Sequence, residues 1–81
     1  MDYRIKDAKY IRDYIIWIKF HDGLSGEIDL KDEIYGPIFE PLKDLEYFKS
    51  FTVHPELKSL TWKNGADFSP EYLYESIREA A

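Results

Sequence analysis

The segment at residues 14–20, YIIWIKF, is the feature that most restricts the fold of this chain. Its apolar and β-branched side chains alternate between two faces, and this pattern predicts a β-strand rather than an amphipathic helix. The even-numbered residues are aromatic or aliphatic, whereas the odd-numbered ones combine Ile15 and Trp17 with Lys19. Because both faces are partly apolar, we predict that this strand lies inside a sheet rather than at its edge.

The HDG segment at residues 21–23 predicts a hairpin turn, and the parity of the apolar residues decides its length. A two-residue Asp-Gly turn would put Glu27 opposite Ile18, on the apolar face. A three-residue turn needs one left-handed residue, which Gly23 supplies, and it puts Gly26 opposite Ile18 instead. A glycine there indicates a bulge or a close approach of another element. We therefore predict the three-residue turn and a strand within Leu24–Leu30, with the pairs Phe20–Leu24, Ile18–Gly26 and Ile16–Ile28.

Shorter elements are predicted on both sides of this hairpin. Residues 3–10 have a weaker strand pattern that two charged residues interrupt, so we expect a bulge or an early end there. Residues 31–50 contain two X-Pro pairs and predict a crossover with short helical turns, one of them capped by Asp44. Residues 51–53 and 60–62 predict a second, short hairpin.

The final segment has the clearest helix signals. Ser69 is a good N-cap, Pro70 suits the first helical position, and Phe68 can pack against Leu73 as a hydrophobic staple. The residues whose helical spacing predicts a buried stripe are Leu73, Ile77 and Ala80, with Tyr74 beside it. With 81 residues the chain is long enough for a single domain, residues 1–81. We predict an α+β fold: a small antiparallel sheet of four to five strands, with short helical turns and a C-terminal helix packed on one face.

Composition restricts the setting and the partners of such a domain. The chain has no cysteine, which excludes disulfides and fits a reducing cytoplasm. It has neither the apolar run of roughly 20 residues that spans a membrane nor an apolar N-terminal signal region, so we expect a cytoplasmic protein that does not enter a membrane. The formal net charge is −5 and the Lys and Arg residues are scattered. This pattern disfavours direct binding to nucleic acid and favours a basic protein partner.

No motif in the sequence supplies catalytic or metal-binding chemistry. The two histidines, His21 and His54, lie in separate predicted loops without a third ligand at metal spacing, and we expect them to be exposed or to cap their loops. There is no Gly-x-Ser-x-Gly sequence and no phosphate-binding glycine loop. The many carboxylates fit capping, turn and solvent-exposed roles. We therefore expect a protein that is not an enzyme and that binds no cofactor or metal.

Residues 62–67, WKNGAD, form the most distinctive motif of the C-terminal half. In a structural interpretation, Trp62 ends a strand, Asn64 and the glycine after it make a turn, and Asp67 bonds turn amides or meets an Arg. In a functional interpretation the same residues form a recognition patch. Aromatic residues, which are enriched at protein interfaces, make up 17% of the chain. The candidate interaction residues are Trp62, Asn64, Asp67, Trp17 and Asp22.

The order of these motifs resembles the small prokaryotic family known as Domain of Unknown Function 2442. The resemblance spans nearly the whole chain and is most specific at the tryptophan motif, where Lys63 replaces a frequent proline. It implies a compact α+β domain without an established activity, and some members resemble partners of a neighbouring small protein in toxin–antitoxin-like pairs. In other members a similar domain precedes a helix-turn-helix domain, for which we expect no room after Ala81. The matching residues are Phe20-His21-Asp22-Gly23, Ile28-Asp29-Leu30, Pro37-Ile38-Phe39, Leu42, Asp44, Phe48, Val53, Pro55-Glu56-Leu57 and residues 62–67.

Together these observations predict a non-catalytic protein-interaction module, the antitoxin-like partner of a small operon-encoded protein. The alternative is a homodimeric regulatory or ligand-sensing domain, joined through an exposed edge strand. A third alternative, an enzyme that uses two carboxylates, requires both groups to line one cleft.

Overall fold

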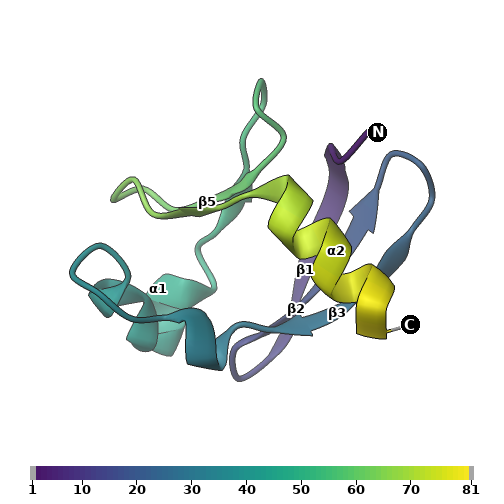
Figure 1. Cartoon of the computed structure of the whole chain (residues 1–81). Coiled ribbons are helices and arrows are strands. Elements are labelled where there is room, and N and C mark those ends of the chain that lie inside the picture. The colour runs from purple at the N-terminus through teal and green to yellow at the C-terminus, as the bar shows by residue number, and fades with distance from the viewer. Residues whose placement is uncertain (1, 81) are drawn as a thin grey trace.

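The computed structural model describes residues 2–80, which form two three-stranded antiparallel sheets, a crossover with short helical pieces and a C-terminal helix. Figure 1 shows the helix α2 (Pro70–Ala80) crossing in front of the first sheet, whereas α1 (Leu45–Phe48) and β5 (Leu60–Thr61) lie away from it. The α+β class and the C-terminal helix are as the sequence predicts. The prediction of one sheet with four to five strands is wrong.

The first sheet is an antiparallel meander in which β2 (Ile15–Phe20) lies between β1 (Ile5–Arg12) and β3 (Ser25–Asp29). The central place of β2 agrees with its two partly apolar faces. β1 begins and ends later than the pattern at residues 3–10 predicts, and its register shifts twice against β2. One shift falls between Ile5 and Asp7, where the sequence predicts a bulge.

The turn after β2 has the predicted three-residue form. The amide of Phe20 donates a hydrogen bond to the carbonyl of Leu24 at 2.8 Å, and Gly23 adopts a φ of +99°. Gly26 is the predicted point of close approach, since the helix α2 packs directly on it through Ile77. The pairs that confirm the predicted register are Ile18–Gly26 and Ile16–Ile28.

Residues 30–51 connect the two sheets through three short helical pieces: η1 (Lys31–Glu33), η2 (Glu40–Lys43) and α1. Oδ1 of Asp44 accepts a hydrogen bond from the amide of Glu46 at 3.1 Å, so Asp44 caps α1 as predicted. Leu42 and Phe48 are fully buried. This packing holds the pieces in place, because isolated helical turns of this length are unstable in water.

The second sheet is small and consists of β4 (Thr52–Val53), β5 and β6 (Asp67–Phe68), with β5 in the centre. β4 and β5 form the predicted short hairpin. β6 is missing from the sequence interpretation, because two residues between a turn and a helix N-cap show no periodicity. The long crossover separates β3 from β4, so the short strands pair with one another and do not extend the first sheet.

The helix α2 begins at the predicted residue, Pro70. Oγ of Ser69 accepts a hydrogen bond from the amide of Tyr72 at 3.4 Å, a long but correctly placed N-cap contact. The first turn also contains Glu71, whose negative charge suits the positive end of the helix dipole. The local signals therefore determine where this helix starts.

The buried side of α2 differs from the prediction at one position. Leu73 and Ile77 are buried as predicted, but Ala80 is exposed, so the last turn no longer packs on the sheet. Tyr74, which the sequence places beside this stripe, provides the third buried side chain. Its ring packs edge-on against Phe20, with 4.9 Å between the ring centroids.

Both sheets, the crossover and α2 share one hydrophobic core. Trp62 lies in an aromatic cluster, with its ring centroid 5.7 Å from that of Phe48 and 5.8 Å from that of Phe68. The buried residues of the core are Ile5, Ile16, Ile18, Phe20, Leu30, Ile34, Leu42, Phe48, Leu60, Trp62, Ala66, Phe68, Leu73, Tyr74 and Ile77.

Candidate interaction surface

The five candidate interaction residues lie in three separate places. Trp62 and Asn64 belong to the chain reversal between β5 and β6, and Asp67 is the first residue of β6. Asp22 lies in the turn between β2 and β3, and Trp17 lies in the middle of β2. The structure therefore does not bring them together into one patch.

Trp62 is part of the core, because only 4% of its surface is exposed. Its indole Nε1 donates a hydrogen bond to the carbonyl oxygen of Phe48 at 2.9 Å. Phe48 ends α1, and carbonyls at helix ends lack partners within the helix. Trp62 thus joins the second sheet to the crossover, and its ring is not available to a partner.

Asn64 ties the same chain reversal to the crossover. Its Nδ2 donates to the carbonyl of Ile38 at 2.8 Å, while its Oδ1 accepts from the amide of Ala66 at 3.0 Å. Its own amide donates to the hydroxyl of Tyr47 at 3.0 Å. Asp67 is exposed, and its carboxylate makes no hydrogen bond or ion pair within residues 2–80. The geometry gives Asn64 a structural role and leaves Asp67 facing solvent.

Asp22 joins the β2–β3 turn to the helix α2. Its Oδ1 accepts a hydrogen bond from the amide of Leu24 at 2.9 Å, and its Oδ2 accepts one from the hydroxyl of Tyr74 at 2.5 Å. The Tyr74 hydrogen bond, followed by the Leu24 amide, lowers the pKa of Asp22. The same hydrogen bond raises the pKa of Tyr74. Asp22 therefore has a role in holding α2 over the hairpin.

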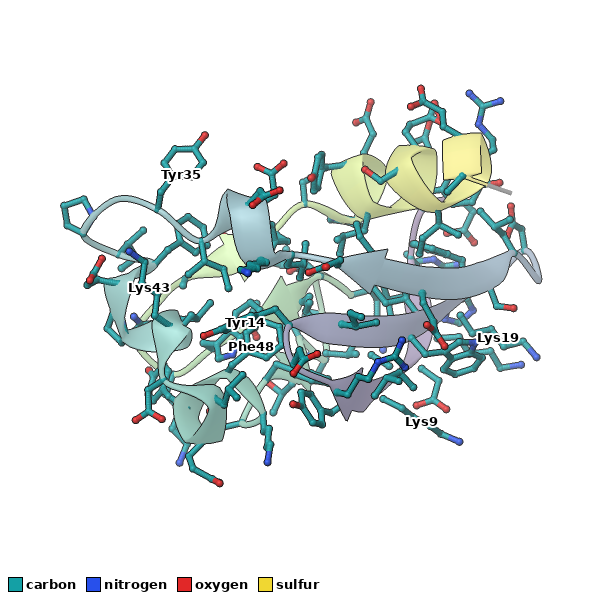
Figure 2. All side chains as sticks on the ribbon, turned by 90° about the horizontal axis from the view of Figure 1, so that it is seen from below. Lys9, Tyr14, Lys19, Tyr35, Lys43 and Phe48 are labelled. Carbon is teal, nitrogen blue, oxygen red and sulfur yellow. The ribbon has the colours of Figure 1, made fainter. Side chains whose placement is uncertain are left out.

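Trp17 lies on the face of the first sheet that points away from α2, and we call this face the open face. Opposite residues of paired strands share a face, so the strand register defines its members. Trp17 and Ile15 are half-buried at its centre, and Nζ of Lys9 lies 5.6 Å from the Trp17 ring centroid. Figure 2 shows Lys9 and Lys19 on the side of the molecule away from α2. The open face consists of Asp7, Lys9, Arg12, Ile15, Trp17, Lys19, Ser25, Glu27 and Asp29.

Charge on the open face differs from one outer strand to the other. Lys9 and Arg12 lie on β1 beside one carboxylate, Asp7, whereas Glu27 and Asp29 lie on β3, on the other side of the apolar centre. All five of these residues are exposed, and Lys19 on β2 is half-buried. An aromatic centre with a charged rim is typical of surfaces that bind proteins.

The sequence predicts only part of the open face. The alternation of residues within β2 places Trp17 on it. The β1 residues beside Trp17 do not follow from the sequence, because two register shifts change which residues of β1 face this side.

The structure also contains a pocket of about 210 Å³ between the β1–β2 turn and the crossover, lined by Tyr14, Lys31, Ile34 and Lys43. The hydroxyl of Tyr14 donates to the carbonyl of Lys43, and Nζ of Lys43 lies 3.2 Å from Oε2 of Glu40. Figure 2 shows Tyr14 beside Phe48 at this junction. The pocket is smaller than the roughly 300–1,000 Å³ of most ligand sites.

The histidines occupy loops, as the sequence predicts. His21 is exposed in the β2–β3 turn. Nδ1 of His54 accepts hydrogen bonds from the amides of Glu56 at 3.1 Å and Leu57 at 3.0 Å, so it caps its loop.

Within the described residues, no group of three or more His, Cys, Asp or Glu side chains could hold a metal ion. No helix in this same part of the chain is long and apolar enough to cross a membrane.

The fold and the open face define a small α+β domain with one uncovered sheet face. A family model described as Protein of unknown function (DUF2442) matches residues 5–79, and the chain belongs to this family. This match confirms the resemblance found in the sequence motifs. No curated protein and no solved structure was found to match the chain.

Proposed function

We propose that this chain is a non-catalytic protein-interaction module that binds its partner through the open face. We further propose that it acts in the cytoplasm as the antitoxin-like member of a pair of small proteins encoded in one operon. One observation carries the proposal: Trp17 lies half-buried in the centre of a sheet face that α2 does not cover.

The position of Trp17 suits it to be the anchor of an interface. Residues that contribute most to binding are often Trp, Tyr or Arg near the centre of a contact, surrounded by residues that exclude water. Ile15 extends the apolar centre along β2, and Lys9 fixes one side of the Trp17 ring through a cation–π contact. An aromatic side chain that is held in place loses little further conformational entropy when a partner covers it.

The charges at the rim support a protein partner with a complementary arrangement. The chain as a whole carries a formal charge of −5, which accelerates association with a basic partner. The basic residues of the open face lie on β1 and β2, whereas β3 carries only acidic ones, so the partner would have to present positive charge over β3 and negative charge towards β1. This arrangement of charge would also determine the orientation in which the partner binds.

The test compares the wild-type chain with Trp17→Ala and Tyr35→Ala. Tyr35 is 69% exposed in the crossover, and Figure 2 shows it at the other end of the molecule from Lys9 and Lys19. Tagged proteins are used to capture partners from the native cells, and the captured protein is then titrated with each variant. We expect a Kd below about 10 μM for the wild-type chain and a loss of at least about tenfold, near 1.4 kcal/mol, for Trp17→Ala.

The control variant Tyr35→Ala should bind within about twofold of the wild-type chain, because it leaves the open face intact. If no protein binds the wild-type chain with a Kd below about 10 μM, the interaction module is the wrong function. If both variants bind equally well, the open face is the wrong surface.

A further inference from the structure

We propose that the free edge of β3 accepts an extended, basic segment of a partner protein, which adds a fourth strand to the first sheet. The inference rests on the proposed function, since it names the binding mode and the chemistry of the partner. Its basis is the combination of unpaired backbone groups with exposed carboxylates along one strand.

The outer edge of β3 has backbone groups that are available for pairing. The hydrogen bonds from Phe20 to Leu24 and from Leu30 to Tyr14 show that the even-numbered residues of this segment face β2. The amides and carbonyls of the odd-numbered residues therefore point away from the sheet. These are the groups of Ser25, Glu27 and Asp29, and they make no hydrogen bond with any other residue in the range 2–80.

The edge formed by β1 is protected, in contrast to that of β3. The amide of Ile5 donates to the carbonyl of Lys58 at 3.1 Å, and the amide of Ala8 donates to Oδ1 of Asp7 at 2.9 Å. Two register shifts also distort β1. Bulges and local side-chain bonds of this kind prevent an edge strand from pairing with another chain. β3 has a regular register along its whole length, so only one edge of this sheet is suited to strand addition.

The charges on β3 favour a basic segment over a second copy of the chain. In an antiparallel pair of two β3 strands centred on Glu27, this residue would face its own copy, and a shift by one residue pair would place it opposite Asp29 or, in the other direction, opposite the uncharged Ser25. Like charges directly opposite each other destabilise a pair of strands. A Lys or Arg at each of these positions would instead form a cross-strand ion pair with Glu27 or Asp29.

The added strand would extend a row of side chains that crosses the open face from β1 to β3. The existing row contains Lys9, Trp17 and Glu27 on adjacent strands. A partner residue opposite Glu27 would lie on the open face, next in the row, and a basic side chain there would pair with the carboxylate. The partner segment should therefore carry Lys or Arg at every second residue, with β-branched residues between them.

The experiment uses two capped nine-residue peptides as probes. One alternates lysine with threonine and valine, and the other has glutamate in place of each lysine. Binding to the ¹⁵N-labelled full chain is followed by amide chemical shifts at low salt. We expect the basic peptide to shift the amides of Ser25, Glu27 and Asp29 most strongly, whereas the acidic peptide should not bind.

Three variants separate charge from backbone pairing. Glu27→Lys combined with Asp29→Lys should lower the affinity for the basic peptide by at least about tenfold and allow the acidic peptide to bind. Glu56→Lys combined with Asp67→Lys changes the net charge equally at exposed sites of the second sheet and its loop, and should weaken binding by less than about threefold. Ser25→Pro leaves the charge unchanged but removes one outward amide, and should weaken binding by at least about threefold.

The outcomes distinguish this inference from the proposed function. The inference is wrong if both charge variants weaken binding equally, if the shifts lie away from β3, or if the basic peptide does not bind. It is also wrong if light scattering shows a dimer whose β3 amides are protected from exchange. In any of these cases, a Trp17→Ala variant that still loses the captured partner leaves the proposed function intact.

Discussion

The side chain of Ile77 occupies the space above Gly26, because a Cβ atom added to this glycine would lie 2.8 Å from Cγ2 of Ile77. Real Cβ contacts are almost never this short, so α2 approaches β3 as closely as the backbone of the strand allows. Gly26 is paired with Ile18 at the centre of the hairpin. Its lack of a side chain therefore determines the distance between helix and sheet, and with it the shape of the core.

Replacing Gly26 by alanine should destabilise the protein by about 1–3 kcal/mol, because the added methyl group forces α2 away from β3. Urea unfolding followed by circular dichroism measures the effect. Ser25→Ala is the matched control, since it changes an exposed neighbour in the same strand, and it should change the stability by less than about 0.5 kcal/mol.

A second substitution tests whether the contact with Ile77 causes this loss. Ile77→Leu moves the branch away from Cβ and should itself cost less than about 1.5 kcal/mol. In the Ile77→Leu background, Gly26→Ala should cost at least about 0.5 kcal/mol less than in the wild-type chain. Equal costs in both backgrounds would show that the close approach to Ile77 is not the cause.

The side-chain amide of Asn64 should stabilise the chain reversal between β5 and β6. Asn64→Asp keeps an oxygen for the amide of Ala66 but loses the donor to the Ile38 carbonyl, so we expect a loss of about 1 kcal/mol. Asn64→Ala removes both bonds and should cost about 2 kcal/mol. Lys63→Ala is the neighbouring exposed control. If all three variants have the same stability in urea, these hydrogen bonds contribute nothing measurable.

The sequence predicts the parts of this fold in which several constraints act on the same residues. The pairing of Ile16 with Ile28 follows from the parity of the apolar residues and from the single glycine that can close the turn. The start of α2 follows from Ser69 and Pro70 in the same way. In both cases, only one arrangement satisfies the local backbone and the burial of side chains together.

The parts of the fold that the sequence does not predict are those determined by tertiary contacts. β6 has two residues and exists because the turn at residues 63–66 returns the chain to β5. The open face depends on two register shifts in β1, whose positions the alternation of residues does not reveal. Trp17 and Trp62 have the same residue type, yet only the assembled core shows that Trp62 is buried among aromatic rings and that Trp17 is not.

The bond between Asp22 and Tyr74 should make stability depend on pH at both extremes. The pKa of Asp22 is lower in the folded protein than in the unfolded chain. Its contribution to the free energy of unfolding is therefore complete above the unfolded-state pKa near 4, and it is lost as the pH falls through the folded-state pKa. The pKa of Tyr74 is higher in the folded protein than in the unfolded chain. Its contribution to the free energy of unfolding is therefore complete below about pH 10, the unfolded-state pKa, and it is lost as the pH rises through the folded-state pKa. Urea midpoints across the pH range measure both limits.

Two variants assign this pH dependence to the pair. Asp22→Asn and Tyr74→Phe should each reduce both the acid and the alkaline dependence, because each group causes the pKa shift of the other. Asp2 also has a lowered pKa, because Arg4 donates hydrogen bonds to it, so some acid dependence remains in every variant. A wild-type chain and an Asp22→Asn variant with parallel stability curves below pH 4 would contradict the assignment.

The different exposure of the two tryptophans should be visible in solution. In Trp17→Phe the remaining Trp62 is 4% exposed and packed among aromatic rings, so its emission should be blue-shifted and poorly quenched by acrylamide. The wild-type chain should show an additional red-shifted component that acrylamide quenches, since Trp17 lies half-buried on the open face. Trp17→Phe should also change the stability by less than about 0.5 kcal/mol.

The reverse variant, Trp62→Phe, provides the matched comparison. It removes the donor to the buried carbonyl of Phe48 and should cost about 1–3 kcal/mol, while its emission comes only from Trp17 and should be red-shifted and readily quenched. Equal quenching of the two variants would mean that Trp17 is covered in the free protein, by a second copy or by a rearranged strand. A partner that binds the open face should then protect Trp17 from acrylamide in Trp62→Phe and leave the emission of Trp17→Phe unchanged.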